Sequence, residues 1–273
     1  MSSATIENKL QTCRDILDQL GSVVIGFSGG VDSTLLLSLA VEQLGRQNVL
    51  AALAVCEVMS GWEIDQAHRM VQRIGTELVE LRIEPLKDHN FVSNRPDRCY
   101  HCKKKIFSAF VDLARSRGLH AVCSGANADD TGDYRPGLLA EKELGIREPL
   151  LQAALGKAEI RQLSRQRDLE TWDSPSMACL ASRVPYGQEI SAEKLRQVEQ
   201  GEALLRQAGF RQYRLRHHGE LARIEVPADQ IDRLVAMRES LVEQVRALGF
   251  AYVTLDLQGF RSGSMNETLD LEP

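Results

Sequence analysis

The sequence predicts an α/β protein with a doubly wound parallel sheet and a second, smaller α+β domain. Short, almost wholly apolar runs alternate with amphipathic helical patterns up to about residue 184. Repeated βα units of this kind build a parallel sheet that is covered by helices on both faces. After about residue 185, alternating polar and apolar residues replace the apolar runs. The chain has 273 residues and is 43% hydrophobic, which suffices for substantial cores.

The first part of the chain contains the βα units. An amphipathic helix is expected over 1–20, and Gly21 ends it. Strands are expected at 23–27, 48–55, 77–83 and 120–126. Further helices are expected over 31–44, 62–74, 98–117 and 157–169. Right-handed crossovers make such a sheet doubly wound, and its ligands bind at the carboxyl ends of the strands.

The second part is shorter and mixes helices with alternating strands. Helices are expected over 193–208 and 228–248, and strands at 212–217, 221–226 and 251–257. Gly219 lies between the first two strands and indicates a hairpin. We therefore predict two domains, 1–184 and 185–273.

Charge and composition exclude several classes of protein. The chain has 33 Lys and Arg against 38 Asp and Glu, a net charge of −5, which argues against nonspecific nucleic-acid binding. No apolar run approaches the ~20 residues that span a bilayer, and residues 1–20 do not resemble a signal peptide. We therefore expect a cytoplasmic protein with no membrane partner, whose six cysteines are reduced thiols.

A glycine-rich turn, FSGGVDS at 27–33, joins the first expected strand to the next helix. Its glycines let the backbone turn tightly, and the free N–H groups at the helix start can receive phosphate oxygens. The candidate ligand-binding residues are Ser28, Gly29, Gly30, Asp32 and Ser33. Asp32 fits an anion site only if a metal ion such as Mg²⁺ bridges it to the phosphates. An ordinary glycine turn before a helix is the alternative.

The turn resembles the SGGxDS motif of the PP-loop ATP pyrophosphatases, which have a Rossmann-like fold of the HUP type. The resemblance implies that the chain cleaves ATP between the α and β phosphates, adenylylates an acceptor and releases pyrophosphate. A second stretch similar to this family is GANADD at 125–130, which implies ATP binding by Asn127, Asp129 and Asp130. A solvated turn is the alternative there. The PL…KxExR stretch at 149–161, which includes Lys157, is a weaker likeness.

The cysteines fall into two groups. Cys13, Cys56 and Cys123 lie in apolar patterns and are interpreted as core residues. Cys99 and Cys102 form a CxxC pair where a helix is expected to begin. One such pair does not complete a tetrahedral zinc site, and two structural thiols on a helix are the alternative.

Cys179 lies on a loop that prolines and a glycine frame, at the expected domain boundary. A thiol on such a loop, with Arg183 close by, is a candidate nucleophile. A lone cysteine is usually structural. An adenylylating domain in the same chain favours the nucleophile, because the activated centre needs a group to attack it.

Several motifs together resemble the LarE family of ATP-dependent sulfur transferases. They are FSGGVDS, RCYHCK, GANADD with DYRPG, ACLASRVPYG and RLRHHG, and they extend from about 23 to 226. LarE proteins convert the carboxylates of pyridinium-3,5-biscarboxylic acid mononucleotide to thiocarboxylates, in biosynthesis of the nickel-pincer nucleotide cofactor of lactate racemase. The resemblance implies this pyridinium mononucleotide as substrate, ATP and Mg²⁺ as cofactors, and a homo-oligomer, a hexamer by analogy.

The resemblance makes Cys179 the sulfur donor. Its thiolate would attack the acyl adenylate, AMP would leave, and elimination would convert the cysteine to dehydroalanine. Some LarE proteins instead hold a [4Fe-4S] cluster on three cysteines, for which Cys99, Cys102 and Cys179 are the candidates. Both routes remain open at this stage.

Basic residues of the expected hairpin are candidates for substrate binding. Arg214 and Arg216 alternate along a strand and project from one face, where two guanidinium groups could fork onto a phosphate. An exposed charged strand is the alternative. The resemblance favours substrate binding for both, and for Arg183. Residues 183–273 hold 12 Lys and Arg against 14 Asp and Glu, which disfavours a further alternative, a tRNA-thiolating PP-loop enzyme.

Overall fold

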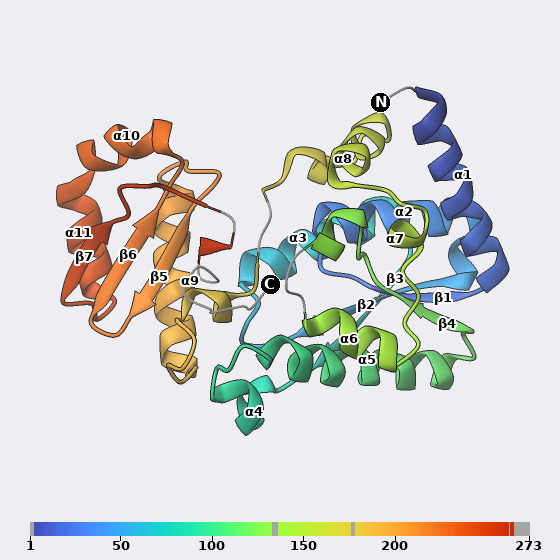
Figure 1. Cartoon of the computed structure of the whole chain (residues 1–273), viewed down its shortest axis with the longest axis horizontal. Coiled ribbons are helices and arrows are strands. Elements are labelled where there is room, and N and C mark those ends of the chain that lie inside the picture. Colours follow the sequence, from blue (N-terminus) through green and yellow to red (C-terminus); the bar gives the residue numbers. More distant parts are fainter. Residues whose placement is uncertain (1–2, 133–135, 176–177, 262, 265–273) are drawn as a thin grey trace. The chain divides into compact units, whose positions relative to one another are not determined.

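The chain forms two compact units in a computed structural model that describes residues 3–132, 136–175, 178–261 and 263–264 (Figure 1). The first unit consists of Met1–Pro85 and Asp97–Ser176. The second consists of Leu86–Pro96 and Met177–Pro273. This division differs from a boundary after residue 184 in two respects. The segment around Cys179 belongs to the second unit, and so does a short segment from the first half of the chain.

Four parallel strands form the sheet of the first unit, which confirms the expected fold class. Their spatial order is β3–β2–β1–β4, and their bounds are β1 Val23–Gly26, β2 Val49–Val55, β3 Glu77–Arg82 and β4 Ala121–Cys123. In register, Val23 of β1 lies beside Val49 of β2 on one side and Ala121 of β4 on the other. The carboxyl ends of all four strands therefore meet at one edge of the sheet.

Helices cover both faces of this sheet (Figure 1). The core on one face takes side chains from α1 Ser3–Leu20, α2 Val31–Leu44, α3 Gly61–Ile74, α7 Pro149–Gln152 and α8 Lys157–Gln166. The other face packs against α5 Arg98–Arg117, beside which α6 Pro136–Glu143 lies. Successive residues of β1 alternate, so that Ile25 enters the first core and Val24 the second.

Helix α2 is held in the core by its leucines. The side chains of Leu35, Leu36, Leu37 and Leu39 are all 0% exposed. Full burial of one such side chain contributes about 1.5–3 kcal/mol. The helix that carries the phosphate-loop sequence at its start is therefore firmly held by the core.

The second unit contains a three-stranded sheet in the order β5–β6–β7. Strands β5 Arg214–His218 and β6 Leu221–Glu225 are antiparallel, with Gly219 at φ +68 in the turn, as the hairpin prediction required. Strand β7 Tyr252–Leu255 pairs with β6 in parallel. The helices are α4 His89–Val92, α9 Ala192–Gln207, α10 Ile231–Ala236 and α11 Arg238–Ala247.

Some elements are shorter than the sequence suggests. The helix expected over 228–248 is divided, because Met237 leaves helical geometry (φ −96, ψ 6) between α10 and α11. Strand β4 ends at Cys123, after which Ser124 donates its N–H to the Arg147 carbonyl at 2.9 Å. Among the described helices, none is long and apolar enough to cross a membrane.

Asn94 ties its short segment to the turn after the Cys179 loop. The side chain is fully buried, and its Nδ2 donates to the carbonyls of Val184, Pro185 and Gln188 at 3.2, 2.7 and 2.9 Å. Its own carbonyl accepts from the Gly187 N–H at 3.0 Å. The backbone is left-handed (φ 53), a conformation that asparagine tolerates better than most residues.

We expect Asn94→Ala to lower the free energy of unfolding by about 2–4 kcal/mol, because buried acceptors lose their donor and alanine disfavours the left-handed backbone. Asn94→Gly removes only the hydrogen bonds and should cost about 1 kcal/mol less. Chemical denaturation measures both. Asn90→Ala, at an exposed position of the same segment, is the control. Equal effects of all three substitutions would contradict a stabilising role for the Asn94 hydrogen bonds.

Candidate active site

The phosphate-loop sequence forms the turn between β1 and α2. Gly30 caps α2 with extended backbone (φ −77, ψ 168), and no side chain caps the first turn. The first N–H groups of a helix have no intrahelical acceptor and can bind an anion. The Ser33 hydroxyl closes the turn, because it donates to the Gly30 carbonyl at 3.2 Å and accepts from the Ser28 N–H at 3.3 Å. The two serine hydroxyls lie 3.2 Å apart.

Two glycines allow this turn to touch its neighbours. Gly29 has φ +70, and a Cβ there would lie 3.0 Å from the Ala67 backbone of α3. The Gln66 side chain donates to the Gly29 carbonyl at 2.7 Å. Gly125 follows β4, and a Cβ at that position would lie 3.0 Å from the Ser33 nitrogen. The loop after β4 thus packs directly on the start of α2.

Asp32 lies in the first turn of α2 and pairs with a cation. Its carboxylate binds the ammonium group of Lys157, the first residue of α8. It also accepts from the Asn127 side chain, at 3.4 Å. The site residues predicted from the sequence do not include Lys157, although the PL…KxExR stretch contains it. The structure brings Asp32 and Asn127 together and adds Lys157 to them.

Asp129 and Asp130 shape the loop after β4. Asp130 is buried and accepts the Asn127 N–H at 3.0 Å. Asp129 accepts the Lys157 N–H at 2.8 Å and thereby caps the start of α8. Both carboxylates therefore bind backbone, and one of them orients Lys157. Residues 133–135 of the DYRPG stretch lie outside the described residues.

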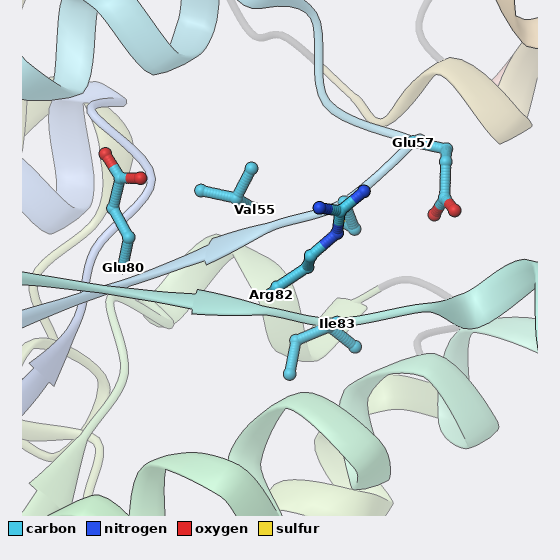
Figure 2. Close-up of a pocket in the computed structure, with 6 residues that line it drawn as sticks. Val55, Glu57, Glu80, Arg82 and Ile83 are labelled. Carbon is cyan, nitrogen blue, oxygen red and sulfur yellow. The ribbon is translucent and has the colours of Figure 1, made fainter.

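A cavity of about 490 Å³ lies at the carboxyl ends of β2 and β3. Val55 and Ile83 give it apolar walls, and Cys56 also lines it. Three charged side chains also line it, and in the view of Figure 2 the Arg82 guanidinium lies between the carboxylates of Glu57 and Glu80. Strand β1, which leads into the phosphate-loop turn, is the neighbour of β2 in the same sheet. The cavity therefore opens at the edge where ligands of parallel sheets bind.

The cysteines differ in burial. Cys13 and Cys123 are 0% exposed, and burial raises the pKa of both thiols to about 12, so they are inert core residues. Cys56 is half-buried, against the expectation of a core residue. Cys99 and Cys102 are half-buried in the first two turns of α5. Among the described residues, no three His, Cys, Asp or Glu side chains form a group that could hold a metal ion.

The half-buried Cys179 immediately precedes a short 3₁₀ helix, Leu180–Arg183, in the second unit. The Arg183 side chain is 0% exposed and its guanidinium forks onto the Glu202 carboxylate of α9, at 2.7 and 3.1 Å. Its remaining terminal nitrogen donates to the carbonyls of Ala178 and Cys179, at 2.5 and 3.1 Å. The arginine next to the candidate nucleophile thus has internal partners.

Arg214 and Arg216 do not form an exposed charged strand, because both are buried. Arg216 forks onto Glu225 of β6, with both distances 2.9 Å. The Arg214 guanidinium stacks on the Phe260 ring, 5.0 Å from its centroid. Burial, and next the Arg183 guanidinium, lower the pKa of Arg214 to about 10. Guanidinium groups are therefore crowded in the interior of this unit.

Comparison with known proteins places these features in a family. The chain is 38% identical over 266 residues to the pyridinium-3,5-bisthiocarboxylic acid mononucleotide synthase of Lactiplantibacillus plantarum, a match that covers 97% of this chain and 96% of the relative. The chain belongs to the LarE family. It is also 40% identical over 266 residues to an uncharacterised protein of Synechocystis, covering 97% of this chain and 99% of that relative.

The nucleotide-binding part of this LarE protein has wider relatives. The NAD synthase family model matches residues 3–117. An NH(3)-dependent NAD(+) synthetase of Pelodictyon phaeoclathratiforme is 40% identical over 72 residues, 26% of each chain. These matches belong to the PP-loop class of ATP-using enzymes, so ATP is a cosubstrate of the protein. The family model covers the turn with Asp32 but ends before the loop that carries Asn127 and before Lys157.

We expect Lys157→Met to weaken ATP binding about tenfold or more. The substitution removes the cation beside Asp32, and a hydrogen bond to a charged group contributes about 1.5–3 kcal/mol. Isothermal titration with ATP and Mg²⁺ measures the change. Lys105→Met, at an exposed position of α5, is the control, and unchanged affinity in Lys157→Met would contradict a role for this ammonium at the phosphates.

Proposed function

We propose that the protein is an ATP-dependent sulfur transferase that adenylylates the carboxylates of pyridinium-3,5-biscarboxylic acid mononucleotide and converts them to thiocarboxylates. The observation that carries this proposal is the near full-length match to a synthase of the corresponding bisthiocarboxylic acid mononucleotide. The phosphate-loop turn and the Cys179 loop support it, because the reaction needs an adenylylation site and a sulfur donor. The product would serve the nickel-pincer nucleotide cofactor.

The first unit supplies the residues for adenylylation. The N–H groups at the start of α2, with the hydroxyls of Ser28 and Ser33, are suited to bind phosphate oxygens. The Asp32 carboxylate, which the Lys157 ammonium and the Asn127 amide contact, would be the oxygen ligand for Mg²⁺. The metal ion would neutralise charge on the departing pyrophosphate. The cavity of about 490 Å³ at β2 and β3 has the volume of a small-molecule site and would receive the nucleoside part of ATP.

The second unit supplies the sulfur. The Cys179 thiolate attacks the acyl carbon of the adenylate, so that a C–S bond forms while the bond from that carbon to the AMP oxygen breaks. In the elimination that follows, a base removes the Cα proton of Cys179. The electron pair forms the Cα–Cβ double bond, the Cβ–S bond breaks, and the thiocarboxylate departs with the sulfur. Dehydroalanine is left at position 179.

The crowded arginines of this unit suit the phosphate of the mononucleotide. Burial, and next the charges of Arg183 and Arg216, lower the pKa of Arg214, so an anion bound beside these groups would favour the charged form of Arg214. A guanidinium group binds phosphate with two parallel hydrogen bonds. We assign the substrate phosphate to Arg214, with Arg216 next to it on the same face of β5.

A cluster mechanism is the second candidate, and the CxxC pair favours it. Cys99 and Cys102 are three residues apart at the start of α5 and both are half-buried, so they lie on one side of that helix. They are suited as two ligands of a [4Fe-4S] cluster, with Cys179 as the third. Such a cluster would supply sulfide in place of the cysteine sulfur.

We expect Cys179→Ser to abolish sulfur transfer while pyrophosphate release continues, because the hydroxyl cannot supply sulfur. Wild-type protein after turnover should lose the mass of one sulfur and two hydrogens from the peptide that contains Cys179. Peptide mass spectrometry and iron analysis of anaerobically purified protein measure this, with Cys13→Ala, at a thiol in the core of the first unit, as the control. An intact Cys179 after turnover, together with bound iron, would overturn the sacrificial route and support the cluster.

We expect Arg214→Gln to raise the KM for the pyridinium mononucleotide about tenfold or more, because the substrate phosphate loses a charged hydrogen-bond donor. The KM for ATP should not change, and a substrate that lacks the phosphate should react equally with both proteins. Arg223→Gln, which removes another partner of Glu225, is the matched control. An equal loss with both substrates would contradict phosphate binding at Arg214.

A further inference from the structure

The backbone around Cys179 is held from inside the protein. The terminal nitrogen of Arg183 that faces the loop donates to the carbonyls of Ala178 and Cys179 and to the Ser182 hydroxyl, at 2.5, 3.1 and 2.8 Å. The Cys179 carbonyl also accepts from the Ser182 N–H at 2.9 Å and from its hydroxyl at 2.8 Å. Three donors therefore converge on the carbonyl of the candidate sulfur donor.

The other side of the same guanidinium is fixed to the framework of the unit. Glu202 of α9 accepts the two remaining nitrogens and is itself only 4% exposed. Its Oε1 also accepts the Leu215 N–H of β5, at 3.2 Å. Arg183 thus connects the loop to a helix and a strand at once. A lysine ammonium has no second arm with which to make both connections.

Arg216 provides a second connection further along the loop. It donates to the Ser182 carbonyl at 3.0 Å while its other nitrogens bind Glu225. The loop carbonyls at 178, 179 and 182 are therefore all held by partly buried, charge-assisted hydrogen bonds. Such bonds are about twice as strong as neutral ones. The Cys179 backbone has φ −58 and ψ 151, and this geometry sets the direction in which its side chain leaves the loop.

We propose that Arg183 is a positioning residue: it fixes the backbone that presents the Cys179 thiol, which is a role different from the substrate contact expected from the sequence. This inference rests on the proposed function in one respect, namely that Cys179 is the sulfur donor. Attack on an acyl adenylate requires the sulfur within about 3–3.5 Å of the carbon and in line with it. A loop free to shift by an ångström would lose that alignment, so its immobility has a direct effect on rate.

The experiment is amide hydrogen exchange of the full-length protein without substrate, followed by mass spectrometry. In Arg183→Lys the single ammonium can keep Glu202 or the loop but not both. We expect exchange in 178–184 to become about tenfold faster or more, while exchange in α9 and β5 stays within twofold of the wild type. Arg223→Lys, which changes another partner of Glu225, should leave the exchange of 178–184 unchanged.

Ser182→Ala is the second variant, because it removes one donor to the Cys179 carbonyl and one acceptor of the Arg183 guanidinium but leaves both charges of the Arg183–Glu202 pair in place. We expect an intermediate, severalfold faster exchange in the same segment. Unchanged exchange of 178–184 in both variants would overturn the proposal. Faster exchange in α9 and β5 as well would also overturn it, because it would show that Arg183 only stabilises the framework.

The rate of sulfur transfer then tests whether the position matters for chemistry. In Arg183→Lys the single-turnover rate should fall about 100-fold, with the KM for ATP and the pyrophosphate release unchanged. A normal transfer rate with a loosened loop would overturn the positioning role. If the wild-type protein transfers no sulfur, the proposed function fails, and the exchange result still reports separately on the loop.

Discussion

Close packing of the phosphate-loop turn against its neighbours is the constraint on which the first unit depends. Side chains cannot be added at Gly26, Gly29 or Gly125 without contacts of about 3 Å to Phe107, to Ala67 or to the Ser33 backbone. The turn is therefore held from the α5 side of the sheet, from α3 and from the loop after β4. Because the buried leucines of α2 fix the helix behind it, the N–H groups at the helix start keep one direction.

In the second unit the organising interactions are two buried ion pairs. Arg183–Glu202 and Arg216–Glu225 lie in the interior, with Glu225 0% exposed. Burying charges is expensive unless each is hydrogen-bonded as well as paired. The loop carbonyls before and after Cys179 provide those additional acceptors. The same atoms that satisfy the arginines therefore fix the loop, so the stability of this unit and the placement of the thiol have one origin.

The sequence predicted the parallel sheet and the phosphate-loop turn because both have local signatures, namely apolar strands and glycines between a strand and a helix. It could not predict Lys157 beside Asp32, since 125 residues separate them and only tertiary packing brings α8 to α2. The arginines show the same limit. Alternation along β5 indicates that Arg214 and Arg216 share a face, but it does not reveal that Glu225 of β6 pairs with Arg216 in the interior.

Asp32 places a carboxylate in a site suited to anions, and its pairing with Lys157 explains how the site tolerates that charge. A carboxylate beside the free N–H groups of a helix start would itself be attracted to them, and it would repel a phosphate. The Lys157 ammonium neutralises it, and Asp129 orients Lys157 through a backbone hydrogen bond. One positive charge thus offsets one negative charge at the start of α2. The positive field at the helix terminus therefore remains available to bind phosphate. A lone aspartate at this position would have cancelled that field.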